Sequence, residues 1–198
     1  MTVLSDLYSE ISRCTACELA KTRTNVVPGE GSADADIVFI GEAPGSQEDK
    51  LGRPFVGPAG KILDQLLESI SLDRHKVHIC NVIKCRPPGN RDPLPVEIDA
   101  CSSWLESQLE IISPRVIVTL GRHSMVRFIP GTTIGRAHGT AQSINGRLYF
   151  AMYHPAAALH QQRLRQTIEA DMLKLPVLLA QQIAEKKAEL QPEQLSMF

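Results

Sequence analysis

Four short apolar runs, separated by longer segments of helical periodicity, constrain the fold of this chain more than any other feature. Each run is rich in β-branched or aromatic side chains, which is typical of strands buried on both faces of a parallel sheet. The runs span residues 37–40, 77–82, 116–120 and 148–152. Because strands alternate with helices, the sequence predicts an α/β fold with a central four-stranded parallel sheet.

The segments between these runs have apolar residues three and four positions apart, as in the series Ile62, Leu66 and Ile70. The expected helices span residues 4–12, 59–70, 95–112, 122–128 and about 160–189. A length of 198 residues is typical of a single domain. We therefore expect one domain over residues 1–186, with the cysteines inside it, and a flexible tail over residues 187–198.

The composition excludes several classes of protein. No apolar run approaches the roughly 18 residues of a membrane span, and the first ten residues lack the basic and apolar regions of a signal peptide. We expect a cytoplasmic protein with no membrane partner. The formal net charge of −1 gives no overall attraction to nucleic acid, so a nucleic-acid function would depend on local clusters of basic residues.

The segment from Gly41 to Lys61 follows the first apolar run and has the composition of a long irregular loop. It contains five glycines and three prolines, which favour tight turns and allow the backbone to approach a ligand closely. It also contains Phe55, a large apolar residue that a disordered segment would not be expected to hold at its centre. Long loops inside compact domains are usually functional, so we interpret this segment as an active-site loop.

Polar residues follow the other predicted strands as well. Asn81 stands at the end of the second run, Gly121-Arg-His follows the third, and His154 comes soon after the fourth. In open parallel sheets, ligands bind in the crevice at the carboxyl ends of the strands. We therefore expect a carboxylate, an amide and an imidazole to meet at one edge of the sheet.

Five cysteines in a chain without an export signal favour a metal site over a disulfide framework. Cys14 and Cys17 form a Cys-x2-Cys pair, and Cys85 and Cys101 follow after 67 and then 15 intervening residues. Four thiolates suit either zinc or an iron-sulfur cluster, and the spacing does not choose between them. The fifth cysteine, Cys80, lies in an apolar strand and is expected to be a small core residue.

Three motifs, together with the four cysteines around them, resemble the family 4 uracil-DNA glycosylases. The motifs are GEAPGSQEDKLGRPFVGPAGK at residues 41–61, NVIKCRPPGNRDP at residues 81–93 and YHPAA at residues 153–157. The similarity covers about residues 1–180. It implies a three-layer α/β/α sandwich, a structural [4Fe-4S] cluster held by the four cysteines, and excision of uracil from DNA without a nucleotide cofactor. A cytoplasmic enzyme of this kind would be associated with the nucleoid.

Residue chemistry assigns roles within this resemblance. The base must be flipped out of the stack and held in a pocket, where Phe55 would stack on it and Gly41, Glu42 and Ala43 would line the wall. Asn81 would both donate to and accept from one edge of uracil, a pattern that cytosine does not match. His154 would donate a hydrogen bond to the carbonyl of the departing uracil and stabilise its negative charge.

The group that activates water is less obvious from the sequence. Glu42 is the first candidate, because it is nearest to a strand end and a carboxylate there would also offset positive charge on the sugar. The best-known uracil-DNA glycosylase family has an aspartate at the position that Ala43 occupies in this chain. Glu48 and Asn90 are therefore accessory candidates, although ordinary hydrogen bonding within a loop explains each of them equally well.

Basic residues cluster near the same motifs and predict a track for DNA phosphates. They are Lys50, Arg53, Lys61, Lys84, Arg86, Arg91, Arg163 and Arg165. The segment from His154 to Arg165 is expected to enter the duplex as a loop, with Ala156, Ala157 and Leu159 as candidate wedge residues.

The last five residues, Gln194, Leu195, Ser196, Met197 and Phe198, resemble the peptide with which bacterial repair proteins bind the sliding clamp. The alternative is an unspecialised terminus. For the whole chain, the alternatives to a uracil-DNA glycosylase are a relative that acts on another deaminated base or traps uracil covalently, a noncatalytic iron-sulfur module that binds DNA, and an iron-sulfur redox sensor.

Overall fold

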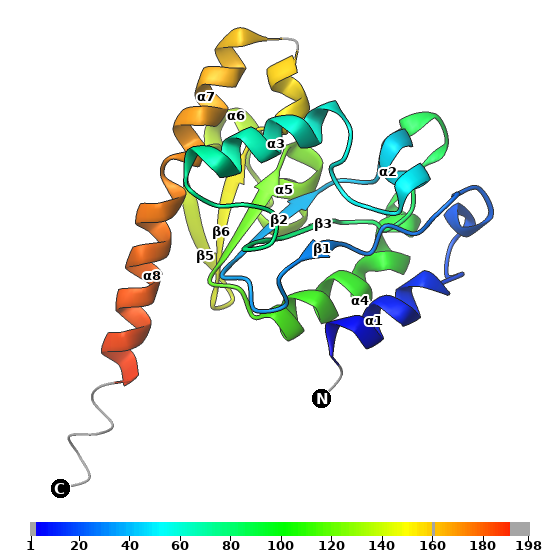
Figure 1. Cartoon of the computed structure of the whole chain (residues 1–198), viewed down its shortest axis with the longest axis horizontal. Coiled ribbons are helices and arrows are strands. Elements are labelled where there is room, and N and C mark those ends of the chain that lie inside the picture. The colour runs from blue at the N-terminus through cyan, green and yellow to red at the C-terminus, as the bar shows by residue number, and fades with distance from the viewer. Residues whose placement is uncertain (1–2, 160, 191–198) are drawn as a thin grey trace, which may run out of the picture.

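A six-stranded mixed sheet forms the centre of the computed structural model, which describes residues 3–159 and 161–190 (Figure 1). The strands are β1 (Glu30–Gly31), β2 (Ile37–Gly41), β3 (His78–Asn81), β4 (Val116–Leu120), β5 (Ala141–Ile144) and β6 (Arg147–Met152). Their order in the sheet is β1-β3-β2-β4-β6-β5. Neighbours among β3, β2, β4 and β6 pair in parallel, whereas β1 and β5 pair antiparallel at the two edges.

The predicted α/β class is confirmed, but the predicted sheet of four parallel strands has to be corrected to a mixed sheet of six. The two missing strands carry no apolar signal. β1 is only two residues long, and three of the four residues of β5 are exposed. An edge strand of this kind is held by backbone hydrogen bonds to its neighbour and does not need a buried face, so hydrophobic patterning does not reveal it.

The sheet has a separate apolar core on each face. Successive side chains of a strand point to opposite faces, so in β2 Val38 and Ile40 join one core and Ile37 and Phe39 join the other. The first core includes residues of α1 (Leu4–Ser12) and α4 (Pro95–Ile112). The second includes residues of α3 (Pro58–Ser69) and α7 (Gln162–Met172). In Figure 1 these two pairs of helices accordingly lie on opposite sides of the sheet.

The remaining helices differ in one respect from those that the sequence predicts. They are α2 (Ser46–Leu51), α5 (Arg122–Phe128), α6 (Ile134–Ala137) and α8 (Leu175–Leu190), with short 3-10 turns at Glu18–Lys21, Pro88–Asn90 and Pro155–Leu159. The long helix expected over residues 160–189 is instead two helices, α7 and α8. Pro176 explains the break, because proline lacks a backbone N–H and its ring clashes with the preceding turn of a helix.

The loop from Gly41 to Lys61 is also more ordered than expected, because it contains the helix α2 and ends inside α3. Its register with the next motif is set by the sheet: Gly41 pairs with Asn81 across β2 and β3. On its other side β2 pairs in parallel with β4, and β4 in turn pairs in parallel with β6. The segments that follow these four parallel strands therefore leave the sheet at the same edge. No helix within the described ranges is long and apolar enough to cross a membrane.

Candidate functional site

A pocket of about 420 Å³ opens at this edge of the sheet, a size usual for small-molecule sites. Its wall includes Glu42, Ala43, Glu48, Phe55, Asn81, Asn90, Arg91, His154 and Ala156. The fold thus brings together residues of all three sequence motifs, from the ends of β2, β3 and β6 and from the loops after them. Gly41 is not part of the wall but lies directly beneath it.

Gly41 allows two wall residues to approach the backbone of β2. A Cβ atom at this position would lie 2.7 Å from the ring of Phe55 and would also collide with the side-chain oxygen of Asn81. Asn81 itself is 2% exposed and lines the pocket. Among the described residues, none hydrogen-bonds the Asn81 side-chain amide, so its donor and acceptor are both available to a ligand in the pocket.

Phe55 is held in an uncommon backbone conformation. Its φ angle is +51°, in the left-handed region that non-glycine residues rarely adopt. The Arg74 guanidinium donates hydrogen bonds to the carbonyls of Pro54 and Phe55, and it is itself held by Asp64 and Glu30 at 3.0 and 3.2 Å. These contacts fix a backbone that costs on the order of 1–3 kcal/mol to hold, which suggests a functional position for the ring.

The His154 imidazole faces the Phe55 ring, with ring centroids 5.6 Å apart and planes 28° apart. Burial lowers the pKa of His154 to about 4, although the nearby Glu48 carboxylate acts in the opposite direction. The ring is therefore neutral at physiological pH. Its Nδ1 accepts a hydrogen bond of 3.1 Å from the backbone N–H of Ala156. In a neutral imidazole the proton is then on Nε2, which makes this nitrogen a donor.

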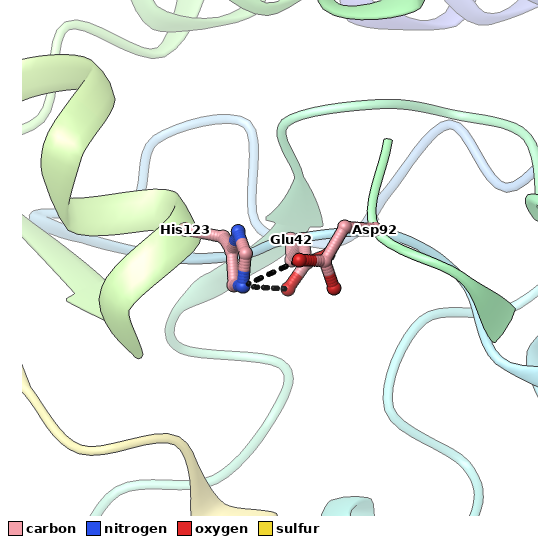
Figure 2. Close-up of side chains that lie close together, drawn as sticks. All are labelled: Glu42, Asp92 and His123. Atoms are coloured by element: carbon pink, nitrogen blue, oxygen red, sulfur yellow. Dashed lines mark ion pairs between the residues drawn. The ribbon is translucent and has the colours of Figure 1, made fainter. Parts of the chain in front are cut away.

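Glu42 lies in the pocket wall beside a group of charged residues that sequence reasoning did not assign to the site. His123 Nε2 is 3.9 Å from the Glu42 carboxylate and 3.3 Å from that of Asp92. Dashed lines mark these two ion pairs in Figure 2. Burial raises the pKa of Glu42, as does the Asp92 charge, whereas His123 and Arg122 lower it. Glu42 is thus a partly buried carboxylate whose charge depends on its neighbours.

The two accessory candidates both serve to hold loops in place. Glu48 Oε1 accepts hydrogen bonds of 2.9 Å from the backbone N–H groups of Val56 and Gly57, next to Phe55. Asn90 Oδ1 accepts one of 2.7 Å from Arg86 Nε. Both residues line the pocket, so their side chains are within reach of a ligand while they stabilise its wall.

The four predicted ligand cysteines line one small cavity on the opposite side of β3 from the Phe55 loop. Three of their sulfurs accept hydrogen bonds from different donors. Trp104 Nε1 donates to Cys14, Arg23 Nη1 donates to Cys85, and the backbone N–H of Lys84 donates to Cys101, at 3.2 to 3.3 Å. Cys80 is fully buried in β3, as expected for a core residue.

The predicted DNA-binding residues need one correction. Lys84 is 1% exposed, and its ammonium group donates a 2.7 Å hydrogen bond to the carbonyl of Asn81. It cannot contact a phosphate on the surface. The prediction failed because Lys84 follows a buried strand, where the chain folds its side chain back under Asn81. Lys50, Arg53 and Arg163 are exposed, and Arg53 pairs with Glu30. Arg86 donates a hydrogen bond to Asn90, and Arg165 pairs with Glu169.

The remaining basic residues and the wedge candidates also have defined positions. Arg91 pairs with the buried carboxylate of Glu97 at 2.6 Å, which ties the second motif to α4. The segment after His154 is a 3-10 turn followed by α7, so it is not the open loop that was expected. Within it, the Leu159 side chain is 44% exposed, whereas Ala156 and Ala157 are half-buried.

Four residues near the site were given no role from the sequence: Arg74, Asp92, Arg122 and His123. A signal existed for two of them, because Arg122 and His123 directly follow the end of β4. Arg74 lies between two elements and Asp92 in a loop, and neither position has a pattern that indicates a role. Their importance depends on contacts with Phe55 and with His123 that only the folded chain creates.

Comparison with known proteins identifies the family of this chain. Residues 28–175 match the family model described as the uracil DNA glycosylase superfamily. The type-4 uracil-DNA glycosylase of Archaeoglobus fulgidus is 48% identical over 88% of this chain and 92% of its own length. The type-4 enzyme of Thermotoga maritima is 45% identical over 86% and 92%. A type-5 uracil-DNA glycosylase of Pyrobaculum aerophilum is 31% identical over 66% and 65%. The chain therefore belongs to the uracil DNA glycosylase superfamily and, within it, to the type-4 uracil-DNA glycosylases.

Proposed function

We propose that this protein excises uracil from DNA by hydrolysing the bond between the base and its deoxyribose, which leaves an abasic site. The observation that carries the proposal is the pocket in which Glu42, Asn81, Phe55 and His154 meet. Glu42 would supply a carboxylate that accepts a proton, and Asn81 an amide that hydrogen-bonds one edge of uracil. Phe55 would supply a ring for stacking and His154 a hydrogen-bond donor. Their types and arrangement match the needs of a reaction on a base that has been flipped out of the duplex.

Recognition of uracil is assigned to Phe55 and Asn81. Stacking of a base on an aromatic ring contributes about 1–3 kcal/mol and does not depend on the identity of the base. Selectivity would come from Asn81, whose amide donates to a carbonyl oxygen and accepts from the ring N–H of uracil. Cytosine reverses this pattern at the same edge, so it would leave buried polar groups unpaired.

Departure of the base is assigned to His154. As the bond between C1′ of the sugar and N1 of the base breaks, the electron pair stays on N1 and the negative charge spreads to the carbonyl oxygens. The Nε2–H group of a neutral imidazole would donate to one of these oxygens and stabilise the charge. The hydrogen bond from Ala156 to Nδ1 supports this role, because it directs the proton to Nε2.

Attack on the sugar is assigned to a water molecule and Glu42. The water oxygen bonds to C1′, and the carboxylate accepts the proton that the water loses. The negative charge of Glu42 also offsets positive charge that develops on the deoxyribose. Glu48 and Asn90 would shape the wall beside this water, since each already has hydrogen bonds within the loops.

We also propose that Cys14, Cys17, Cys85 and Cys101 hold a [4Fe-4S] cluster. The four side chains line one small cavity, and a set of four thiolates fits a cluster of this type. N–H donors to the sulfurs and the buried charge of Lys84 also suit a site of net negative charge. The cluster would link α4, the N-terminal segment and the second motif.

The surface around the pocket would bind the DNA backbone. The exposed side chains of Lys50 and Arg163 and the basic residues Arg53, Arg86, Arg91 and Arg165 are proposed to contact phosphates. Leu159 is the best candidate for a wedge in the duplex, because its apolar side chain is the most exposed of the three candidates. The proposed domain over residues 1–186 contains all of these groups.

The test is excision from oligonucleotides with one uracil, in single-stranded and double-stranded form. We expect alkali-labile sites at uracil and none when thymine occupies the same position. Asn81→Ala and His154→Ala should each lose most of the activity while iron content and the visible absorbance of the cluster stay unchanged. Colourless protein that contains zinc would overturn the cluster assignment alone.

Other results would favour the alternative functions. Absence of alkali-labile sites, in protein with an intact cluster, would overturn the glycosylase. In that case, binding of DNA without any reaction would indicate a noncatalytic module, and cluster oxidation that changes DNA affinity would indicate a redox sensor. Excision of another deaminated base, or a stable adduct between protein and DNA, would identify the two alternatives within the superfamily.

A further inference from the structure

His123 and Asp92 form a charged cluster with Glu42, a residue of the pocket wall, although the three come from separate segments of the chain. His123 is the second residue of α5, Asp92 lies in the loop before α4, and Glu42 follows β2 (Figure 2). One nitrogen of the imidazole and one oxygen of each carboxylate lie within 4.8 Å of one another. The Glu42 and His123 side chains are about one-third exposed, and that of Asp92 is 67% exposed.

A single atom, His123 Nε2, connects the charges of this cluster. It is 3.3 Å from the Asp92 carboxylate and 3.9 Å from the Glu42 carboxylate. It is also 2.9 Å from Arg122 Nη2, and the Arg122 guanidinium is 3.9 Å from Asp92. When the imidazole is neutral, Nε2 accepts a hydrogen bond from Arg122. When it is protonated, Nε2–H is attracted to the two carboxylates and the contact with Arg122 becomes repulsive.

Glu42 needs such a neighbour because two influences oppose its negative charge. Partial burial removes water from the carboxylate, and the Asp92 charge repels it; both raise the pKa of Glu42. The other charges near Glu42 are those of His123 and Arg122, and both lower its pKa. Bound DNA would exclude more water from these partly exposed side chains and so strengthen each of these interactions.

The cluster is not well suited to a metal ion, even though carboxylates and imidazoles are common ligands. The Arg122 guanidinium lies 2.9 Å from the same imidazole nitrogen that would bind the cation. Its positive charge would repel a divalent ion at that point. The arrangement fits electrostatic contacts between side chains better than it fits coordination.

We propose that His123 is a positioning residue for the glycosylase reaction: it orients the Glu42 carboxylate in the pocket wall and stabilises its negative charge, with Asp92 as its own anchor. The inference rests on the proposed function, because it assumes that Glu42 accepts a proton from water. His123 acts through Glu42 and does not touch the base. Its contribution should therefore appear in the rate and its pH dependence, and not in the affinity for DNA.

The experiment measures kcat and KM for a uracil-containing oligonucleotide between about pH 5 and 9 in wild type and His123→Gln. We expect the acid limb of kcat/KM in the variant to move to higher pH by about half a unit or more, because Glu42 loses a favourable charge. At the optimum, kcat should fall severalfold while KM changes little. The matched control is His75→Gln, which removes an exposed imidazole outside the cluster and should give the wild-type profile.

Two further variants separate charge from geometry. His123→Lys keeps a positive charge and should keep the acid limb near its wild-type position. Asp92→Asn in the His123→Gln background removes the opposing negative charge and should move the acid limb back to lower pH. An acid limb that is the same in wild type and His123→Gln, or a loss confined to KM, would overturn the proposal.

Direct titration of the Glu42 carboxyl group by nuclear magnetic resonance tests the same coupling without any reaction. Its midpoint should rise in His123→Gln and stay near wild type in His75→Gln. An unchanged midpoint would also contradict the proposal. If the wild-type protein has no glycosylase activity, the proposed function fails, and this titration still decides whether His123 controls the charge of Glu42.

Discussion

The imidazole of His154 stacks at 5.6 Å on the phenyl ring of Phe55, which comes from a loop about 100 residues earlier in the chain. His154 follows β6, whereas Phe55 lies between α2 and α3. The contact places side by side two pocket residues that we propose to act on different parts of the same base. One ring offers its face for stacking and the other offers an edge nitrogen as a donor, so the two rings have to be placed together.

Phe55→Leu should lower kcat/KM for uracil excision by about fivefold to 150-fold, since stacking of a base on an aromatic ring contributes about 1–3 kcal/mol. Leucine keeps an apolar side chain at this position, so the melting temperature should change much less than the activity does. The measurement is single-turnover excision from a uracil-containing oligonucleotide. Activity equal to wild type would show that the ring is only a core residue.

Arg74→Met should reduce both stability and excision, because Arg74 holds the backbone carbonyls of Pro54 and Phe55. We expect a loss of about 1–3 kcal/mol in the free energy of unfolding, as buried acceptors lose their donor. The matched control is Arg115→Met, which removes a contact of 2.8 Å with Asp36 away from the pocket. The control should lose less than about 1 kcal/mol and no activity. Equal effects of the two variants on kcat/KM would contradict a specific role for Arg74.

The free energy of unfolding should fall as the pH decreases from about 6.5 to about 4. Burial lowers the pKa of His78 and of His154 to about 4 in the folded protein, so only the unfolded chain binds these protons in that range. Their stabilising contribution is therefore complete above pH 6.5 and is lost as the pH falls. Urea denaturation at several pH values measures the slope.

His78→Gln gives the control for this pH dependence. His78 is fully buried and its Nε2 is 2.8 Å from the hydroxyl of Tyr8, so the variant should be less stable at every pH. Its stability should nevertheless change less between pH 6.5 and 4, because one titrating group is gone. An unchanged slope would show that His78 is protonated in the folded protein.

Deletion of residues 194–198 should abolish binding to a bacterial sliding clamp while excision from a short oligonucleotide stays unchanged. These residues lie outside the part of the chain that the structure describes, so this expectation depends on their sequence alone. The measurement is a pull-down with purified clamp. Equal recovery of the clamp with the shortened chain would contradict the prediction.

Much of the site follows from the sequence because of one property of parallel sheets. Glu42, Asn81 and His154 stand at or just after strand ends, and the carboxyl ends of parallel strands lie at the same edge. Phe55 was identified from its setting among glycines and prolines. Edge strands β1 and β5 were not found, because hydrogen bonds to a neighbour define them and their own side chains carry no apolar pattern.

Contacts between separate loops were decided only by the tertiary structure. Lys84 reads as a surface cation in the sequence, yet it lies buried beneath Asn81, where its ammonium group meets a backbone carbonyl. Arg74 becomes important only when the Phe55 loop folds over it, and His123 only when α5 places it beside Asp92 and Glu42. The physical reason is range: strand periodicity and motif spacing are local properties of a chain, whereas the partner of a charged side chain depends on which distant segments pack against it.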